Sequence, residues 1–282
     1  MFIDFLIEVF KRHKDSEAII WKNRSYSYKC LLDEVGRWKE NIKDKITKSG
    51  TVIVLEGGFS PNSIACFLAL VEGSHIIIPL GSLVQRKEVE FKKIAQGEVS
   101  IVFDDDDNAK ISKLPCNADH PLYQKLRQEN HPGLVLFSSG STGKSKAIVH
   151  DLTRILEKFK TPRQAFRTIT FLLYDHIGGI NTMFHILSNA GVIITVQNRT
   201  PDSVLEVVER YKVELLPTTP TFMNLILLSE AYKRYDLSSL KVVSYGTEPM
   251  PEYTLKRFHE LFPKIKLQQT YGLSELGILR SK

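Results

Sequence analysis

The sequence has few of the features that assign a protein to a specialised class at once. Only three of its 282 residues are cysteines, and none of Cys30, Cys66 and Cys116 forms a CxxC pair. Scattered cysteines of this kind are typical of proteins in the reducing interior of the cell. We therefore expect reduced thiols and a cytoplasmic location.

Long apolar segments and targeting segments are also missing from the sequence. Residues 1–8 carry acidic side chains and no basic region, unlike a signal peptide. The most apolar stretch, 64–80, is interrupted by Glu72, Gly73 and His75. This stretch predicts a buried helix, a turn and a strand rather than a membrane span.

Charge of neither sign dominates the sequence. The chain has 38 Lys and Arg against 32 Asp and Glu, which gives a formal charge of +6. This mild excess is compatible with anionic ligands such as nucleotides, but it does not identify one. Basic residues are not clustered with interleaved aromatics, so we expect no nucleic-acid partner. With 43% hydrophobic and 25% charged residues, the composition predicts a globular protein with an ample core.

Short β-branched runs alternate with amphipathic segments along most of the chain. Strands are expected at 18–21, 25–28, 51–55, 76–78, 100–103, 134–137, 147–150, 168–173, 192–196, 214–216, 241–244 and 266–269. Helices are expected at 2–10, 30–46, 61–71, 86–95, 152–159, 180–187, 203–211, 220–228 and 251–261. The alternation predicts an α/β fold that is doubly wound, with mainly parallel sheets covered by helices.

A polar segment at 104–130 interrupts this alternation. It contains the acidic run 104–107 and two prolines, and no spaced pattern of oxygen ligands organises it. We interpret it as a solvated connection rather than a cation site. The predicted domains are therefore a first α/β unit at 1–130 and a second at 131–282. Asp202 is expected to cap the helix at 203–211.

The segment 137–146, Phe-Ser-Ser-Gly-Ser-Thr-Gly-Lys-Ser-Lys, is the most informative part of the sequence. It combines small hydroxyl residues, glycines and lysines between two apolar runs. Backbone amides, hydroxyls and cations in a flexible loop are suited to a polyphosphate. A Walker P-loop would need glycine where Ser138 stands and a helix after Lys144, but a strand is predicted there. An ordinary turn between two strands is the other alternative.

Three further polar segments follow predicted strands, where open α/β sheets bind ligands. The segment 173–179 reads Leu-Tyr-Asp-His-Ile-Gly-Gly, and 243–251 reads Val-Ser-Tyr-Gly-Thr-Glu-Pro-Met-Pro. The segment 269–275 reads Gln-Thr-Tyr-Gly-Leu-Ser-Glu. In the last of these, Glu275 could hold Mg²⁺, Ser274 could bond a phosphate and Tyr271 could stack on a purine.

Taken in this order, the motifs resemble those of the adenylate-forming superfamily, which includes acyl- and aryl-CoA synthetases, luciferases and the adenylation domains of peptide synthetases. The stretch 138–147 is similar to the family's phosphate loop, and 271–275 matches its Tyr-Gly-x-[Ser/Thr]-Glu signature. Two residues depart from the phosphate-loop pattern, since Ser145 replaces the usual Pro and Ala147 the usual Gly. The resemblance covers essentially the whole chain.

The resemblance implies an enzyme, an AMP-forming acid–thiol ligase. Such an enzyme uses ATP and Mg²⁺ to convert a carboxylic acid into an acyl-adenylate and passes the acyl group to CoA or to phosphopantetheine. The implied partners are a small carboxylic acid and an acyl carrier protein. The family continues beyond Glu275 into a small barrel and a mobile domain with a catalytic lysine, so we expect this chain to be an N-terminal fragment of low activity.

The resemblance also implies roles for individual residues. The phosphates would be held by Ser138, Ser139, Gly140, Ser141, Thr142, Gly143 and Lys146, and the α-phosphate by Ser274. The adenine site would be lined by Gly246, Thr247, Glu248, Gln269, Thr270, Tyr271 and Gly272. Thr142 and Glu275 would support Mg²⁺, and His176 would stand beside the acid's carboxylate. Thr142, Lys146, His176 and Glu275 form the implied catalytic set.

The sequence leaves the acid and two other functions open. Apolar pocket candidates such as Phe222, Met223 and Tyr245 favour a fatty or aryl acid, while Asp175 leaves an amino acid possible. A nucleotide-binding module without turnover would bind ATP without exchanging pyrophosphate. A P-loop ATPase or kinase would release ADP and would have a helix after Lys144.

Overall fold

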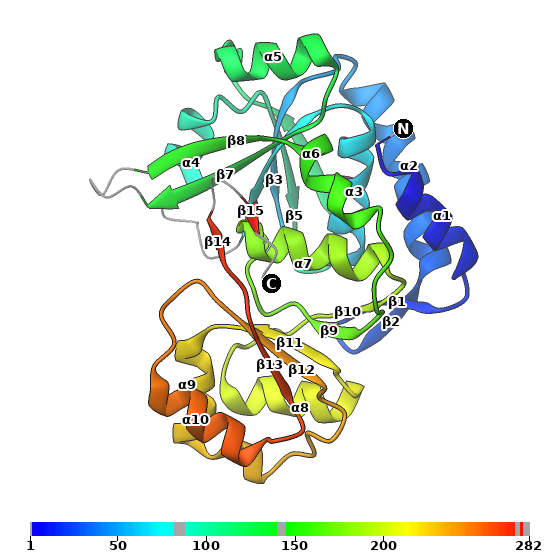
Figure 1. Ribbon diagram of the computed structural model, residues 1–282. Coiled ribbons are helices and arrows are strands. Elements are labelled where there is room, and N and C mark those ends of the chain that lie inside the picture. The colour runs from blue at the N-terminus through cyan, green and yellow to red at the C-terminus, as the bar shows by residue number, and fades with distance from the viewer. Residues whose placement is uncertain (1, 82–87, 140–144, 274–276, 279–282) are drawn as a thin grey trace.

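The structure is a computed structural model that describes residues 2–81, 88–139, 145–273 and 277–278. In this part of the chain two large sheets form two units, which lie one above the other in Figure 1. The last described segment rises from the lower unit to the upper one. It ends in a two-stranded pair, β14 (Gly272–Leu273) and β15 (Gly277–Ile278).

The upper sheet has the strand order β6-β5-β3-β4-β7-β8. Its strands are β3 (Val52–Glu56), β4 (Ile76–Leu80), β5 (Val99–Phe103), β6 (Ala109–Lys113), β7 (Gly133–Ser139) and β8 (Ser145–Asp151). The four central strands are parallel, and β6 and β8 are antiparallel strands at the two edges.

The lower sheet has the order β13-β12-β11-β9-β10-β1-β2. Its strands are β1 (Glu17–Trp21), β2 (Arg24–Ser27), β9 (Arg167–Ile169), β10 (Val192–Ile194), β11 (Leu215–Thr218), β12 (Val242–Tyr245) and β13 (Lys266–Gln269). All neighbours are parallel except the hairpin of β1 and β2. The fold class predicted from the sequence, mainly parallel sheets flanked by helices, is confirmed.

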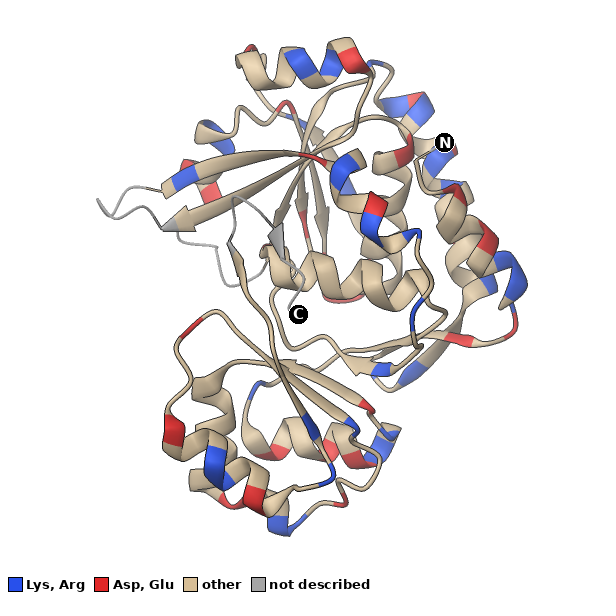
Figure 2. Cartoon of the chain, viewed as in Figure 1, with Lys and Arg blue, Asp and Glu red and all other residues tan. Residues whose placement is uncertain are grey.

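The helices cover both faces of the sheets. They are α1 (Asp4–Arg12), α2 (Tyr28–Lys45), α3 (Pro61–Glu72), α4 (Glu88–Ile94), α5 (Pro121–Glu129), α6 (Leu152–Leu156), α7 (Ile177–Ser188), α8 (Pro201–Tyr211), α9 (Pro220–Ser229) and α10 (Glu252–Leu261), with 3₁₀ turns η2 (Glu157–Phe159) and η3 (Ala231–Lys233). None of these described helices is long and apolar enough to cross a membrane. Figure 2 shows basic and acidic residues interspersed along the helices of both units.

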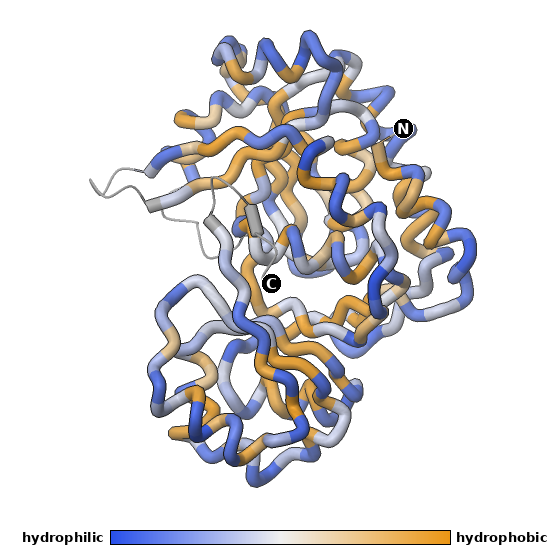
Figure 3. The backbone as a smooth tube through the Cα atoms, viewed as in Figure 1, coloured by the Kyte–Doolittle hydropathy of each residue, from blue (hydrophilic) through white to orange (hydrophobic). Residues whose placement is uncertain are grey.

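Alternating side chains explain why the sheets are buried on both faces. In β3, Ile53 and Leu55 belong to a core shared with α2, α3 and α7, whereas Val52 and Val54 face α4 and α5. Such strands must be apolar throughout, as the hydrophobic colouring of the strands in Figure 3 shows.

Helix α7 connects the two units because it packs on strands of both sheets. Its Phe184 lies in the same core as Leu136 of β7 and Ile193 of β10. Each sheet also contains strands from both sides of residue 130. In the lower sheet β1 pairs with β10, and in the upper sheet β7 and β8 follow β4. The sheets therefore do not divide the chain at residue 130, and the two predicted domains stay a prediction.

The segment 104–130 is more ordered than the sequence suggested. It contains β6 and α5, and Pro121 stands in the first turn of α5, where proline is favoured. Asp107 is buried at 9% exposure and caps α3, with its Oδ2 accepting a hydrogen bond from Asn62 N at 2.7 Å. The interpretation of this segment as a solvated connection was therefore wrong in part.

The cap of α8 also differs from the expectation. The helix begins at Pro201, and the hydroxyl of Thr200 accepts a hydrogen bond from Ser203 N at 3.3 Å. Asp202 lies inside the first turn and pairs with Arg234 instead. The proline at the first helical position moved the start of the helix ahead of the predicted cap.

Candidate functional site

The first part of the candidate site is the hairpin of β7 and β8. Ser138 pairs with Lys146 and Ser139 with Ser145 in antiparallel register. Cross-strand neighbours project to the same face, so the side chains of Ser138 and Lys146 lie together on one face of the hairpin. Lys146 is exposed. Gly140, Ser141, Thr142, Gly143 and Lys144 lie outside the described residues.

The strand that follows this loop decides between two readings of the sequence. Residues Ser145–Asp151 form β8, as predicted, and not a helix. A Walker P-loop requires a helix N-terminus at this position to face the phosphates. The P-loop ATPase or kinase alternative is therefore wrong.

The second part of the site is the segment ahead of α7. Tyr174 is buried at 3% exposure, and its hydroxyl oxygen accepts a hydrogen bond from Ser63 Oγ at 3.4 Å. Asp175 Oδ2 accepts a hydrogen bond from Gly81 N at 3.3 Å, which ties the segment to the end of β4. His176 is the N-cap residue of α7, with its side chain 57% exposed. Its Nε2 lies 3.8 Å from Asp175 Oδ1.

Two glycines allow the chain to turn tightly into α7. A Cβ on Gly179 would lie 1.9 Å from the carbonyl oxygen of Leu173, and one on Gly178 would lie 2.9 Å from Leu172 Cδ1. The backbone contact excludes a side chain at Gly179, whereas the end of the Leu172 side chain can move away from one at Gly178. The chain's own turn therefore needs Gly179.

The third part of the site lies at the carboxyl ends of β12 and β13. Tyr245 and Gln269 are register partners. The next residue, Thr270, donates hydrogen bonds to Tyr245 O from its N at 2.7 Å and its Oγ1 at 3.1 Å. A Cβ on Gly246 would lie 2.5 Å from Thr270 O. Thr247 has a positive φ of 74°. Gly246, Thr247, Gln269 and Thr270 therefore lie at neighbouring strand ends, and their role in one binding site stays a prediction.

Glu248 has a structural contact in addition to its predicted place at the adenine site. Its Oε1 accepts a hydrogen bond from Thr221 N at 2.8 Å, in the first turn of α9. Burial raises the pKa of this carboxyl, but hydrogen bonds from Thr221 and Thr219 outweigh that effect and hold the pKa below its usual range. Glu248 therefore fixes the loop after β12 to α9 as an anion.

The last part of the site joins the two units. Tyr271 is 61% exposed, and Gly272 begins β14, which pairs with β15. Strand β15 packs against α7, the helix that His176 precedes. Ser274 and Glu275 lie outside the described residues, between β14 and β15. The segment after β13 thus runs from the carboxyl edge of the lower sheet to α7.

Two positions that the sequence did not single out belong to the same edges. Gly81 follows β4 and binds Asp175, as described above. Thr218 ends β11 beside Tyr245, is 2% exposed, and its Oγ1 has no hydrogen-bond partner among the described residues. Their place at strand ends was the available signal, but a single Gly or Thr after a strand is too common to indicate a site.

A cluster of possible cation ligands lies away from these edges. Among the described residues Glu129, His131 and Asp151 have ligand atoms within 4.8 Å of one another. His131 Nδ1 lies 3.0 Å from Asp151 Oδ2, at the far end of β8. We interpret this cluster as a structural contact of His131 with Asp151, whose Oδ1 accepts a hydrogen bond from Thr153 N at the cap of α6. The predicted magnesium ligands Thr142 and Glu275 both lie outside the described residues.

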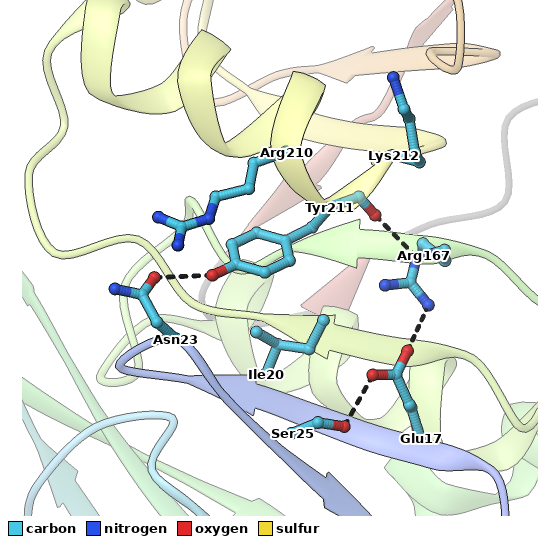
Figure 4. Close-up of a pocket in the computed structure, with 8 residues that line it drawn as sticks. All are labelled: Glu17, Ile20, Asn23, Ser25, Arg167, Arg210, Tyr211 and Lys212. Atoms are coloured by element: carbon cyan, nitrogen blue, oxygen red, sulfur yellow. Dashed lines mark hydrogen bonds and ion pairs between the residues drawn. The ribbon is translucent and has the colours of Figure 1, made fainter.

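A cavity of about 230 Å³ lies at the opposite end of the lower sheet (Figure 4). Its polar groups largely satisfy one another. Arg167 Nη1 lies 2.7 Å from Glu17 Oε2, and the Tyr211 hydroxyl donates to Asn23 Oδ1 at 2.6 Å. Hydrogen bonds from Arg167 and Ser25 hold the pKa of Glu17 below its usual range. These contacts fasten α8 to β1 and β9, so we assign the cavity a structural role.

Comparison with known proteins identifies the family. The sequence model of the family described as "AMP-binding enzyme" matches residues 6–280. A probable CoA ligase from Humulus lupulus is 28% identical over 205 residues, which cover 65% of this chain but 37% of that protein. The chain therefore spans little more than a third of the length of this curated relative.

Solved structures agree in fold. The luciferase-like enzyme from the mealworm Zophobas morio has a TM-score of 0.80 at 20% identity, covering 99% of this chain and 73% of that one. The N-terminal subdomain of NpsA from Klebsiella oxytoca, in complex with 3-hydroxyanthranilyl-AMSN, has a TM-score of 0.77 at 16% identity, covering 99% and 75%. These likenesses concern the fold, and the family match over residues 6–280 shows that the chain belongs to the AMP-binding enzymes, the adenylate-forming family.

Proposed function

We propose that this chain binds ATP and activates a carboxylic acid as its acyl-adenylate, which the thiol of CoA or of a carrier-protein phosphopantetheine then consumes. One observation carries the proposal. The carboxyl edge of the upper sheet, through Gly81 and Asp175, and that of the lower sheet, through the segment after β13, both reach the start of α7. Ligands of open α/β sheets bind at such edges.

The described residues at these edges are suited to ATP. Ser138 and Lys146 offer a hydroxyl and an ammonium group on one face of the hairpin, which fits a phosphate chain. The largely exposed ring of Tyr271 is free to stack on a purine. Gly246 and Thr270, held in contact, would form a fixed wall for that base. Thr142 and Glu275 are the proposed ligands of Mg²⁺.

The electrostatic demand of the reaction explains this set of groups. In the proposed reaction the acid's carboxylate attacks the α-phosphorus of ATP, and negative charge grows on the departing pyrophosphate. Lys146 would meet that charge. His176 stands at the N-cap position of α7, where the helix dipole favours an anion, and its exposed imidazole could donate a hydrogen bond to the acid's carboxylate. The residues from 171 to 179 hold His176 in place through Tyr174 and Asp175.

An aryl or fatty acid is the first candidate substrate. The aromatic rings of Phe171 and Phe222 pack with centroids 4.4 Å apart and planes tilted by 41° near the end of β9, and both residues are buried. Met223 is fully buried in the lower core. Met223 therefore backs the predicted pocket instead of contacting the acid. The aryl group in the name of the Klebsiella complex supports the same class.

A specific observation favours an amino acid as the second candidate. Asp175 Oδ1 is buried and accepts no hydrogen bond from any described residue. A buried carboxylate oxygen without a donor is costly, and an ammonium group would satisfy it. The position of Asp175 directly ahead of His176 would place that ammonium group close to the reacting carboxylate.

Acid-dependent exchange of pyrophosphate into ATP tests the proposal. The native full-length protein should exchange with at least one member of a panel of aryl, fatty and amino acids. Lys146→Ala should reduce exchange by at least a hundredfold, since removing one charge that meets the transition state typically costs this much. Lys110→Ala is the matched control, because Lys110 is an exposed lysine on β6, at the other edge of the same sheet.

Three outcomes would separate the alternatives. Release of ADP would contradict adenylate formation. ATP binding without exchange for any acid would favour a nucleotide-binding module without turnover. Exchange that depends on amino acids and is lost in Asp175→Asn would assign an amino acid as substrate. Exchange with aryl or fatty acids in both the native protein and Asp175→Asn would assign an aryl or fatty acid.

A further inference from the structure

The hairpin of β7 and β8 projects beyond the sheet that it belongs to. Among the described strands, β7 pairs with β4 only at Gly133 and Leu134, although β7 continues to Ser139. From Val135 onward its strand partner is β8, the edge strand (Figure 1). A two-stranded ribbon is marginally stable alone, so the outer half of the hairpin needs lateral support.

Helix α4 provides that support. Phe91 of α4 stacks on Phe137 of β7, with ring centroids 3.8 Å apart and planes 6° from parallel. Phe91 is 8% exposed and lies in one cluster with Val135, and Phe137, Ala147 and Val149 pack against the same cluster. This is one face of the hairpin. Ser138 and Lys146, the next residues along each strand, project from the other face.

Helix α4 is itself fixed to the carboxyl end of β3. Lys92 Nζ lies 2.7 Å from Glu56 Oε1 and also pairs with Glu88. Glu56 Oε1 accepts a further hydrogen bond from Ser100 Oγ at 2.7 Å. The side chains of Lys92 and Glu56 are 20% and 15% exposed, so water screens this pair less than a surface pair. Phe91 is therefore held by the sheet and in turn holds the hairpin.

We infer that Phe91 is a positioning residue for the triphosphate of ATP. It acts through Phe137 and sets where Ser138 and Lys146 stand relative to the carboxyl edge of the sheet. This inference rests on the proposed function, in which Ser138 and Lys146 contact the phosphates. Because the acid would bind elsewhere, beside His176, loss of the stack should weaken ATP binding while leaving acid binding unchanged.

Three variants of the native full-length protein test the inference. Phe91→Leu removes the ring stack but stays apolar, and Phe91→Tyr keeps the ring. Phe262→Leu is the matched control, because Phe262 stacks edge-on on Tyr232 at 5.5 Å, at the far end of the lower unit. The measurements are KM for MgATP, KM for the acid and kcat in pyrophosphate exchange, with Tm recorded for each variant.

Phe91→Leu should raise KM for MgATP about tenfold, which corresponds to ~1.4 kcal/mol. Its KM for the acid should stay within about twofold of the native value. Phe91→Tyr should keep KM for MgATP at the native value. Phe262→Leu should also leave KM for MgATP unchanged, even where Tm falls. The inference is overturned if KM for MgATP rises no more in Phe91→Leu than in the control, or if both KM values rise together.

A failure of the proposed function would be visible separately. If the native protein shows no exchange with any acid, the dissociation constant of MgATP is measured by titration calorimetry in the same variants. A tenfold weaker Kd in Phe91→Leu, with the control unchanged, would support the positioning role in a binding module. An unchanged Kd would overturn it.

Discussion

Gly246→Ala tests whether the ends of β12 and β13 form one unit. An added Cβ would lie 2.5 Å from Thr270 O and 2.6 Å from Thr270 Oγ1. Ordinary contact begins at 3.4 Å, so the backbone at Thr270 would have to move by about 0.9 Å (3.4 − 2.5). That movement would strain the hydrogen bond from Thr270 N to Tyr245 O, now 2.7 Å long.

The expected loss of stability follows from these contacts. Overpacking a close-packed site costs about 1–3 kcal/mol, and a weakened hydrogen bond adds about 0.5–1.5 kcal/mol. We expect the free energy of unfolding to fall by ~2–3 kcal/mol. The same shift should move Tyr271, so KM for MgATP should rise at least tenfold under the proposed function.

Urea denaturation of Gly246→Ala and of Gly36→Ala measures the effect. Gly36 is exposed on α2, and a Cβ there would meet nothing within 4 Å. The control should be more stable than the native protein by about 1 kcal/mol, because alanine is the better helix former. A native-like unfolding free energy and KM in Gly246→Ala would show that the two strand ends move freely, which would refute the reasoning.

Three further predictions concern stability. Arg127→Lys should lower the unfolding free energy, measured in urea, by roughly 2 kcal/mol. Lysine cannot donate to Gly50 O, Ala118 O and Glu98 at the same time, as the guanidinium does. An unchanged unfolding free energy would show that these three hydrogen bonds do not stabilise the fold. Asp107→Ala should cost about 1–2 kcal/mol by uncapping α3, measured in the same way, and a loss below ~0.5 kcal/mol would count against the cap. Burial lowers the pKa of His75 to about 4 from 6.5, so the unfolded chain binds the proton first and stability falls as pH drops from 6.5 to 4. This loss of unfolding free energy is worth roughly 3 kcal/mol. In His75→Leu the unfolding free energy should change less steeply with pH, by the equivalent of one proton, and equal slopes in the native and variant proteins would contradict the prediction.

The sequence predicted most of the buried elements but missed exposed ones. Strands such as β3 are apolar on both faces, so their composition alone predicts them. In β6, by contrast, four of five residues are exposed, so the strand shows no apolar alternation. Helix α5 begins with the proline that we read as a break. Both elements exist because of what they pack on, which a local pattern does not record.

The candidate site was predictable to the extent that its residues follow strands directly. The segments 243–251 and 269–275 were found in this way, and their described residues continue from β12 and β13. The strand predicted at 168–173 ends at Ile169 instead, and Asp175 of 173–179 is bonded to Gly81 after β4 of the other sheet. The contacts that individual residues of these segments make were less predictable. Gly179 serves a turn that Leu173 of the same segment closes, and a list of residues does not record how a segment folds back on itself. Glu248 contacts the start of α9, which lies outside its motif.

The same argument explains why Phe91 could not be recognised from the sequence. It lies well ahead of the phosphate-loop segment, in a helix whose sequence has no motif, and its partner Phe137 reads as the last apolar residue of a strand. Only the register of β7 with β4 shows that the hairpin leaves the sheet after Leu134. Once that is known, a ring stacked at 3.8 Å on the projecting half becomes the contact that decides where Ser138 and Lys146 stand. A loop that binds phosphate needs hydrogen-bond donors, which a sequence motif records. It also needs rigid support, which residues distant in the sequence provide through the fold.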